Sequence, residues 1–265
     1  MDGPEREAPV TAAASVDAAS PPEPAVAILT QPERRGRIAL EIAIASVVVT
    51  ALVTAASMTM PDRYVATTVG FIFLGATWAL VWRKDDGRVV ASGLSLGGVV
   101  LPGERDPRRM LLAAGRAVAW AGAFAAVVFV PFFFGWRWWW HPKGAFAVSA
   151  PWYEIANEAI GQLVIIALPE EAFYRGYLQS RIDDALPGRA RLFGAEIGWG
   201  ILVASVIFAL GHVATIHQPA RLAVFFPSLL FGWMRARTRG VGAGVVFHAS
   251  CNVFSELLGR GYGLY

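Results

Sequence analysis

Charged residues are scarce in this sequence, and their scarcity argues against an ordinary soluble fold. Of the 265 residues, 16% are charged and 55% are hydrophobic, whereas a soluble domain carries roughly 25% charged residues. The composition therefore favours a polytopic membrane protein, with the lipid bilayer as its surroundings. No arginine-rich helix or zinc-finger spacing is present, and the arginines stand between apolar runs. We therefore expect no nucleic-acid partner.

The sequence contains a single cysteine and lacks two common hydrolase motifs. Cys251 is the single cysteine of the sequence, so no disulfide can form within the chain. There is no G-x-S-x-G nucleophile elbow of a serine hydrolase, and no H-E-x-x-H of a zinc metalloprotease. Cys251 stands three residues after His248, which raises a thiol nucleophile as an alternative, but we favour a packing role for it.

The N-terminus lacks the basic start and the apolar core of a secretory signal. Residues 1–33 are instead rich in alanine, proline and acidic residues, a composition that cannot build a buried core. We predict that 1–33 form a disordered cytoplasmic tail. A binding segment within this tail is the alternative.

Seven apolar stretches follow, and a membrane-spanning helix needs about 20 such residues. They are 38–58, 64–82, a part of 110–136, 160–182, 197–214, 222–234 and 240–259. The predicted fold is therefore an all-α bundle of about seven transmembrane helices.

Basic residues alternate between the connections of these stretches. The connections before the first, between the second and third, after the fourth, and between the sixth and seventh each hold three or more, and the others hold one or two. Because basic loops stay in the cytoplasm, we expect a multi-pass protein of the cell (inner) membrane with its N-terminus inside and its C-terminus outside. The tryptophans around 136–152 then suit an outer interfacial belt, with a substrate-contacting rim as the alternative.

Ionisable residues inside a span are costly and normally face a cavity or a partner. The stretch Pro169 to Tyr177 places Glu170, Glu171 and Arg175 in one predicted span. Residues four apart share a helix face, which pairs Glu171 with Arg175. Glu170 is rotated by about 100° and has no such partner. A structural salt bridge would explain Glu171 and Arg175 but would leave Glu170 unexplained.

Two later spans carry the other polar candidates. His212 lies near the end of the fifth span, where a lone histidine is usually structural. His248 and Asn252 lie four apart in the seventh span, on one helix face, which indicates a shared target. Hydrogen bonding between helices is the alternative for this pair.

In this order the motifs E-E-x-x-x-R, F-x-x-x-H and H-x-x-x-N resemble the CPBP/Abi family, the CAAX prenyl protease type II-like glutamic intramembrane endopeptidases. Here they read Glu170 to Arg175, Phe208 to His212 and His248 to Asn252. The end of the chain loosely resembles the myxosortase branch, which processes C-terminal sorting signals. The resemblance covers roughly 155–257 and implies a catalytic membrane core over 151–265. Residues 34–150 carry no motif of the family, and their apolar stretches predict N-terminal transmembrane helices and an interfacial segment.

The residue types suggest how a peptide bond would be hydrolysed. Glu170 can take a proton from water, and His212 can hold the same water. His248 and Asn252 can donate hydrogen bonds to the developing oxyanion. The resemblance implies the same division of roles, with Glu171 and Arg175 orienting Glu170.

Several alternatives remain open at this stage. A zinc ion held by two histidines and a glutamate is the rival mechanism, but we favour catalysis without a cofactor or metal. The expected partner is a protein or peptide substrate, cut in a C-terminal, lipidated or sorting segment. A non-catalytic membrane scaffold or immunity factor, and a transporter with a proton-relay carboxylate, are the alternative functions.

Overall fold

The computed structural model describes residues 32–101, 105–148 and 150–264. The tail predicted over 1–33 therefore lies outside the described residues, except for its last two positions. Those two positions already belong to the first helix, α1 (Pro32–Thr59).

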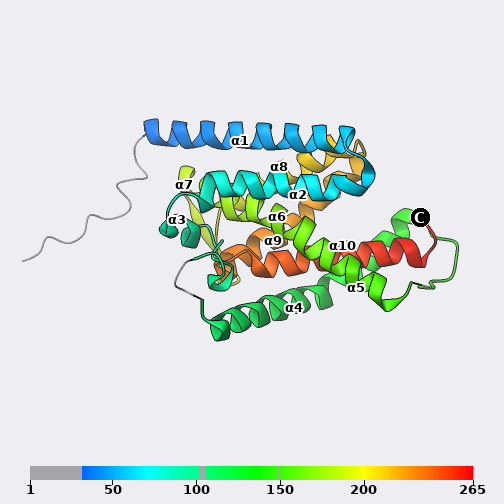
Figure 1. Cartoon of the computed structure of the whole chain (residues 1–265). Helices are drawn as coiled ribbons and strands as arrows, with labels where there is room; N and C mark the ends of the chain where they lie inside the picture. The colour runs from blue at the N-terminus through cyan, green and yellow to red at the C-terminus, as the bar shows by residue number, and fades with distance from the viewer. Residues whose placement is uncertain (1–31, 102–104, 149, 265) are drawn as a thin grey trace, which may run out of the picture.

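Long helices account for most of the described chain, which confirms the prediction of an all-α membrane bundle (Figure 1). After α1 come α2 (Asp62–Thr77), a π-helical turn (Trp78–Trp82), the short α3 (Asp86–Ala91) and a 3₁₀ turn (Leu96–Gly98), and then α4 (Pro107–Trp140). A composite helix follows, and the chain ends with α8 (Trp199–Thr215), a 3₁₀ turn (Pro219–Val224), α9 (Phe225–Thr238) and α10 (Gly242–Gly261).

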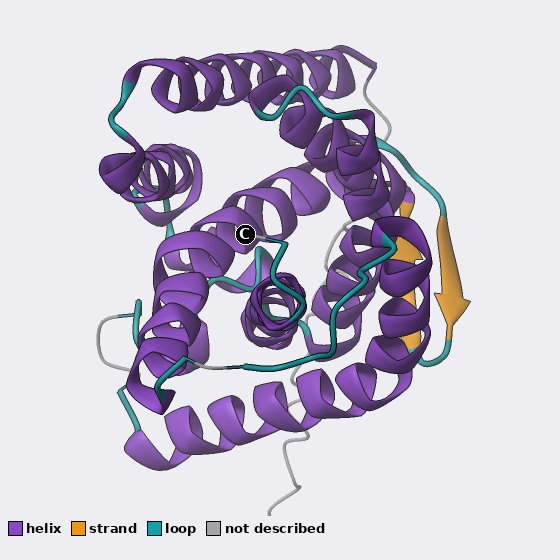
Figure 2. Cartoon of the chain, turned by 90° about the vertical axis from the view of Figure 1, so that its right-hand side faces the viewer, coloured by secondary structure: helices purple, strands orange, loops and turns teal. Residues whose placement is uncertain are grey.

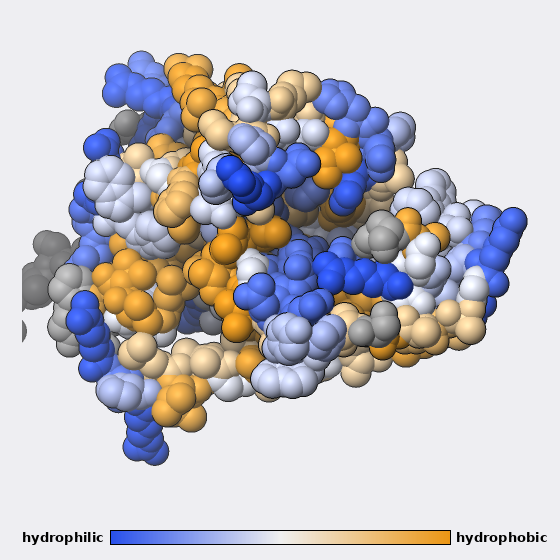
Figure 3. All heavy atoms as spheres, turned by 45° about the vertical axis from the view of Figure 1, so that its right-hand side comes forward, coloured by the Kyte–Doolittle hydropathy of each residue, from blue (hydrophilic) through white to orange (hydrophobic). Residues whose placement is uncertain are grey.

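In the part of the chain that the structure describes, three helices are long and apolar enough to cross a membrane by length and composition: α1, α2 with its π-helical extension, and α4. Large hydrophobic side chains stay exposed along them, among them Leu40, Val47, Phe71, Leu111, Val127 and Trp138. Hydrophobic side chains also reach the surface between hydrophilic ones in the view of Figure 3. Apolar exposure on this scale is typical of a surface that faces lipid.

The composite helix runs from Trp152 to Ala185 and alternates between two helix types. It consists of α5 (Trp152–Gly161), a π-helical segment (Gln162–Ala167), α6 (Leu168–Glu171), a second π-helical segment (Ala172–Gln179) and α7 (Ser180–Ala185). Pro169 lies in α6, between the two π-helical segments. Because proline has no backbone N–H, it cannot donate to the carbonyl of Ile165 four residues earlier.

Helix ends differ from the sequence prediction in two places. α4 continues to Trp140, so the tryptophans at 136–140 lie on its last turns instead of in a connection. α9 continues to Thr238, so Arg235 and Arg237 belong to its last turn. Basic residues interact favourably with the carboxyl end of a helix dipole, which explains why the helix continues through them.

A two-stranded antiparallel hairpin, which we did not predict, joins α7 to α8 (Figure 2, orange). β1 (Arg189–Leu192) pairs with β2 (Ala195–Gly198), with Leu192 opposite Ala195. Phe193 and Gly194 between the strands both have positive φ, 47° and 77°, as a tight primed hairpin turn requires.

Two clusters of buried hydrophobic residues form the core. The larger one surrounds the composite helix and includes Phe73, Phe173 and Tyr177. The smaller one lies where α4, α9 and α10 meet and includes Phe231 and Phe247. Cys251 packs against this second cluster, which fits the packing role that we favoured.

Candidate active site

The composite helix carries both glutamates into the interior of the bundle. Glu171 and Arg175 are fully buried, and Glu170 is 9% exposed. The Arg175 Nε atom lies 3.2 Å from Glu171 Oε2, so the ion pair expected from their spacing is present. Arg175 Nη2 also donates a hydrogen bond of 2.9 Å to Ser228 Oγ on α9. The arginine thus neutralises one glutamate and links the composite helix to α9.

His248 of α10 lies between the two glutamates. Its Nδ1 atom is 3.1 Å from Glu171 Oε1, and its Nε2 atom is 3.8 Å from Glu170 Oε2. The ring is buried and stacks on Phe231, with the ring centres 4.8 Å apart and the planes at 11°. The Glu170 carboxylate, which had no partner in its own helix, therefore faces a histidine from another helix.

His212 approaches the same region from α8. Its Nδ1 atom lies 3.0 Å from the carbonyl oxygen of Phe208. A carbonyl only accepts, so Nδ1 carries the proton, and in the neutral ring Nε2 is free to accept one. The Phe208 ring lies 4.3 Å from the His212 ring and 5.9 Å from the His248 ring, between ring centres. Phe208, the first residue of its motif, thus packs against both histidines.

Asn252 has a different partner from His248, although both lie on one face of α10. Its Nδ2 atom donates a hydrogen bond of 2.8 Å to Gln162 Oε1. Gln162 in turn donates to Glu158 at 2.9 Å, one turn earlier in the composite helix. Sequence reasoning missed Gln162, and its i, i+4 spacing from Glu158 is the signal that could have drawn attention to it.

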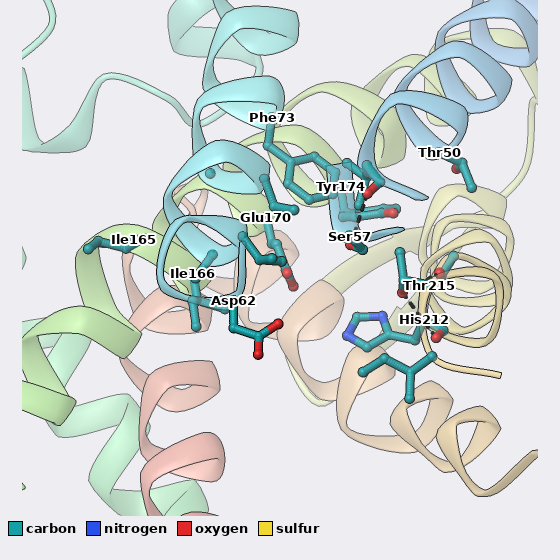
Figure 4. Close-up of a pocket in the computed structure, with 17 residues that line it drawn as sticks. Thr50, Ser57, Asp62, Phe73, Ile165, Ile166, Glu170, Tyr174, His212 and Thr215 are labelled. Carbon is teal, nitrogen blue, oxygen red and sulfur yellow. Dashed lines mark hydrogen bonds between the residues drawn. The ribbon is translucent and has the colours of Figure 1, made fainter. Parts of the chain in front are cut away.

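A cavity of about 520 Å³ lies beside these groups, between α1, α2, the composite helix and α8. Glu170, Tyr174 and His212 line it, whereas His248 and Asn252 do not. Figure 4 shows the Glu170 carboxylate and the His212 ring facing the same space. Glu170 therefore separates the cavity from His248. Glu170 Oε2 has no hydrogen-bond partner among the described residues.

A zinc-dependent mechanism is the alternative to metal-free catalysis by Glu170. Among residues 32–101, 105–148 and 150–264, no group of three histidine, cysteine, aspartate or glutamate side chains is arranged to hold a metal ion. Both nitrogens of His248 face carboxylates, and Nδ1 of His212 faces a carbonyl.

Taken together, the described helices form a bundle that buries a Glu-Glu-Arg-His cluster in its interior. Residues 151–254 match the family described as Rce1-like, Type II CAAX prenyl endopeptidase Rce1-like. This range includes every candidate site residue from Glu170 to Asn252. The match supports the CPBP family, and the finer resemblance to myxosortases stays a prediction. No match was found among the curated proteins or among the solved structures.

Proposed function

We propose that this chain is an intramembrane endopeptidase in which Glu170 activates the attacking water. The observation that carries the proposal is that Glu170 and His212, from two helices and two motifs, line one cavity. The Glu170 carboxylate can accept the proton of a water that His212 Nε2 also holds. The water oxygen then bonds to the scissile carbonyl carbon, and the amine leaves with the proton that Glu170 took up.

His248 and Asn252 serve the oxyanion in this proposal. Neither lines the cavity, so the proposal requires the scissile carbonyl to lie on the side of Glu170 that faces α10. The Glu171 carboxylate only accepts, so Nδ1 of His248 donates to it. In this proposal His248 acts as the imidazolium, the form in which Nε2 also carries a proton and can donate to the oxyanion. An asparagine amide has two N–H donors, and Gln162 engages one of them here. Glu171 and Arg175 are positioning residues, since they fix the side chain of His248 and the helix that carries Glu170. No metal is required in this scheme, and the substrate is a protein segment near the membrane, either C-terminal, lipidated or part of a sorting signal.

Replacing the proposed base tests the proposal. Glu170→Gln keeps the shape of the side chain but cannot take up the proton, so we expect activity to fall by about 10²–10⁴-fold. The measurement is comparative proteomics of membrane and secreted proteins from cells that carry the wild type or Glu170→Gln. Uncut precursors should accumulate with the variant, while its thermal unfolding in detergent stays close to wild type.

Glu256→Gln is the matched control, because Glu256 lies on α10 in an exposed ion pair with Arg260. Equal processing by wild type and Glu170→Gln would favour the scaffold alternative. Loss of processing after treatment with a zinc chelator, with recovery on adding zinc, would favour the metal mechanism.

The orientation is also a proposal. The alternation of basic connections supports a cytoplasmic N-terminus and an external C-terminus, which places the turn between α1 and α2 at the outer end. A reporter that is active only outside the cytoplasm, fused at the C-terminus, should be active. A silent reporter on a stable fusion protein would reverse the orientation.

A further inference from the structure

A second carboxylate, Asp62, lines the same cavity as Glu170. It stands in the first turn of α2, directly after the turn that joins α1 to α2. Figure 4 shows its side chain pointing into the space that Glu170 and His212 face. An acidic residue in the first turn is favoured by the helix dipole. The dipole explains an aspartate at this position but does not explain why the side chain points into the cavity.

Asp62 has no ion-pair partner within the described ranges. Its neighbour Arg63 lies over the Tyr64 ring, with the guanidinium carbon 4.7 Å from the ring centre. Arg221 lies in the 3₁₀ turn after α8. Neither arginine lines the cavity, and no lysine lines it either. Two carboxylates, the exposed Asp62 and the nine-tenths buried Glu170, thus line a cavity whose other lining residues include no lysine or arginine.

Most of the remaining lining is apolar or small, and includes Val65, Val69, Ile165 and Ile166. The volume of about 520 Å³ falls within the ~300–1,000 Å³ of ordinary ligand pockets. Lysine and arginine side chains pair an apolar stem with a charged end. A basic side chain can therefore lay its stem along these residues while its charge reaches Asp62.

We infer that Asp62 is a specificity-determining residue that selects substrates with a lysine or arginine beside the scissile bond. The inference rests on the proposed function, because it assumes that a peptide occupies the cavity next to Glu170. Asp62 takes no part in bond breaking.

A mixed peptide library tests the inference with the purified full chain in lipid nanodiscs. The peptides combine alanine, leucine and serine with lysine, glutamine or glutamate at varied positions, and mass spectrometry reads the cut sites. We expect the wild type to favour lysine over glutamine about fivefold in kcat/KM at one position. Asp62→Asn should abolish this preference, Asp62→Glu should keep it, and Asp62→Lys should favour glutamate instead.

Glu154→Lys is the control, because Glu154 lies exposed in the first turn of α5 and does not line the cavity. It should keep the wild-type preference. Cleavage without a preference for basic residues, or a preference that survives in Asp62→Asn, would overturn the inference and leave the proposed function standing.

A binding measurement separates the two proposals if no peptide is cut. Two library peptides that differ only by lysine or glutamine are titrated against Glu170→Gln, with and without Asp62→Asn. Tighter binding of the lysine peptide that disappears with Asp62→Asn supports the role of Asp62 even when the proposed function fails. Equal binding of both peptides overturns it.

Discussion

The N-terminal helices and the composite helix differ in what their side chains contact within one bundle. α1, α2 and α4 are long and apolar and leave many large hydrophobic side chains exposed. The composite helix changes between α and π geometry, and every residue from Pro169 to Gln179 is buried. A helix that faces lipid needs only hydrophobic side chains. A helix that buries charge needs a specific partner for each polar group, so the two regions should respond differently to substitution.

The largest difference is expected at Glu171. This carboxylate contacts Arg175 at 3.2 Å and His248 at 3.1 Å, and all three side chains are buried. Glu171→Gln removes the charge that compensates Arg175, so we expect a loss of about 3–5 kcal/mol of stability. Thermal unfolding in detergent measures it. Glu256→Gln breaks the exposed pair with Arg260 and should cost about 0–1 kcal/mol. Equal losses of stability in the two variants would show that the buried ion pair contributes no more than the exposed one.

A smaller effect is expected where the two regions touch. A Cβ atom on Gly70 of α2 would lie 2.6 Å from the carbonyl oxygen of Ile165, the one to which Pro169 cannot donate. Because backbone must shift to make room, Gly70→Ala should cost about 1–3 kcal/mol. It should also lower kcat/KM, since both residues line the cavity. Gly75→Ala on the same helix meets nothing within 4 Å, so it should not lose stability. A loss at Gly75 that matches the loss at Gly70 would contradict the explanation by contact with Ile165.

The smallest effect is expected on α4. Cβ atoms at Gly115 and Gly122 would meet nothing within 4 Å. Alanine is the better helix former by about 1 kcal/mol, so Gly115→Ala and Gly122→Ala should leave activity unchanged and raise the unfolding temperature slightly. A marked loss of stability in either variant would mean that this face of α4 packs against protein and does not face lipid.

The sequence predicted the helical fold and the ion pair between Glu171 and Arg175, because both depend on local periodicity. Each of the seven apolar stretches falls mostly on a helical segment, and a spacing of four residues places an arginine over a glutamate. The contact between His248 and both glutamates depends on how α10 packs against the composite helix. The spacing of residues within one helix cannot predict a contact between two helices. The contacts of Ser228 with Arg175 and of Gln162 with Asn252 are also between helices and could not be predicted for the same reason. The hairpin between α7 and α8 was missed because its strands are only four residues long each.

The π-helical segments on either side of α6 bear on how this chain can be aligned with distant relatives. Each π turn accommodates an extra residue compared with an α-helix, and each residue turns the chain by about 100°. Deleting a single residue between Gln162 and Gln179 would therefore rotate the side chains beyond it away from α9 and α10. We expect insertions and deletions among functional relatives to be absent from this segment and to gather in the hairpin over 189–198. The length of the segment would then be as diagnostic of function as the identity of its glutamates.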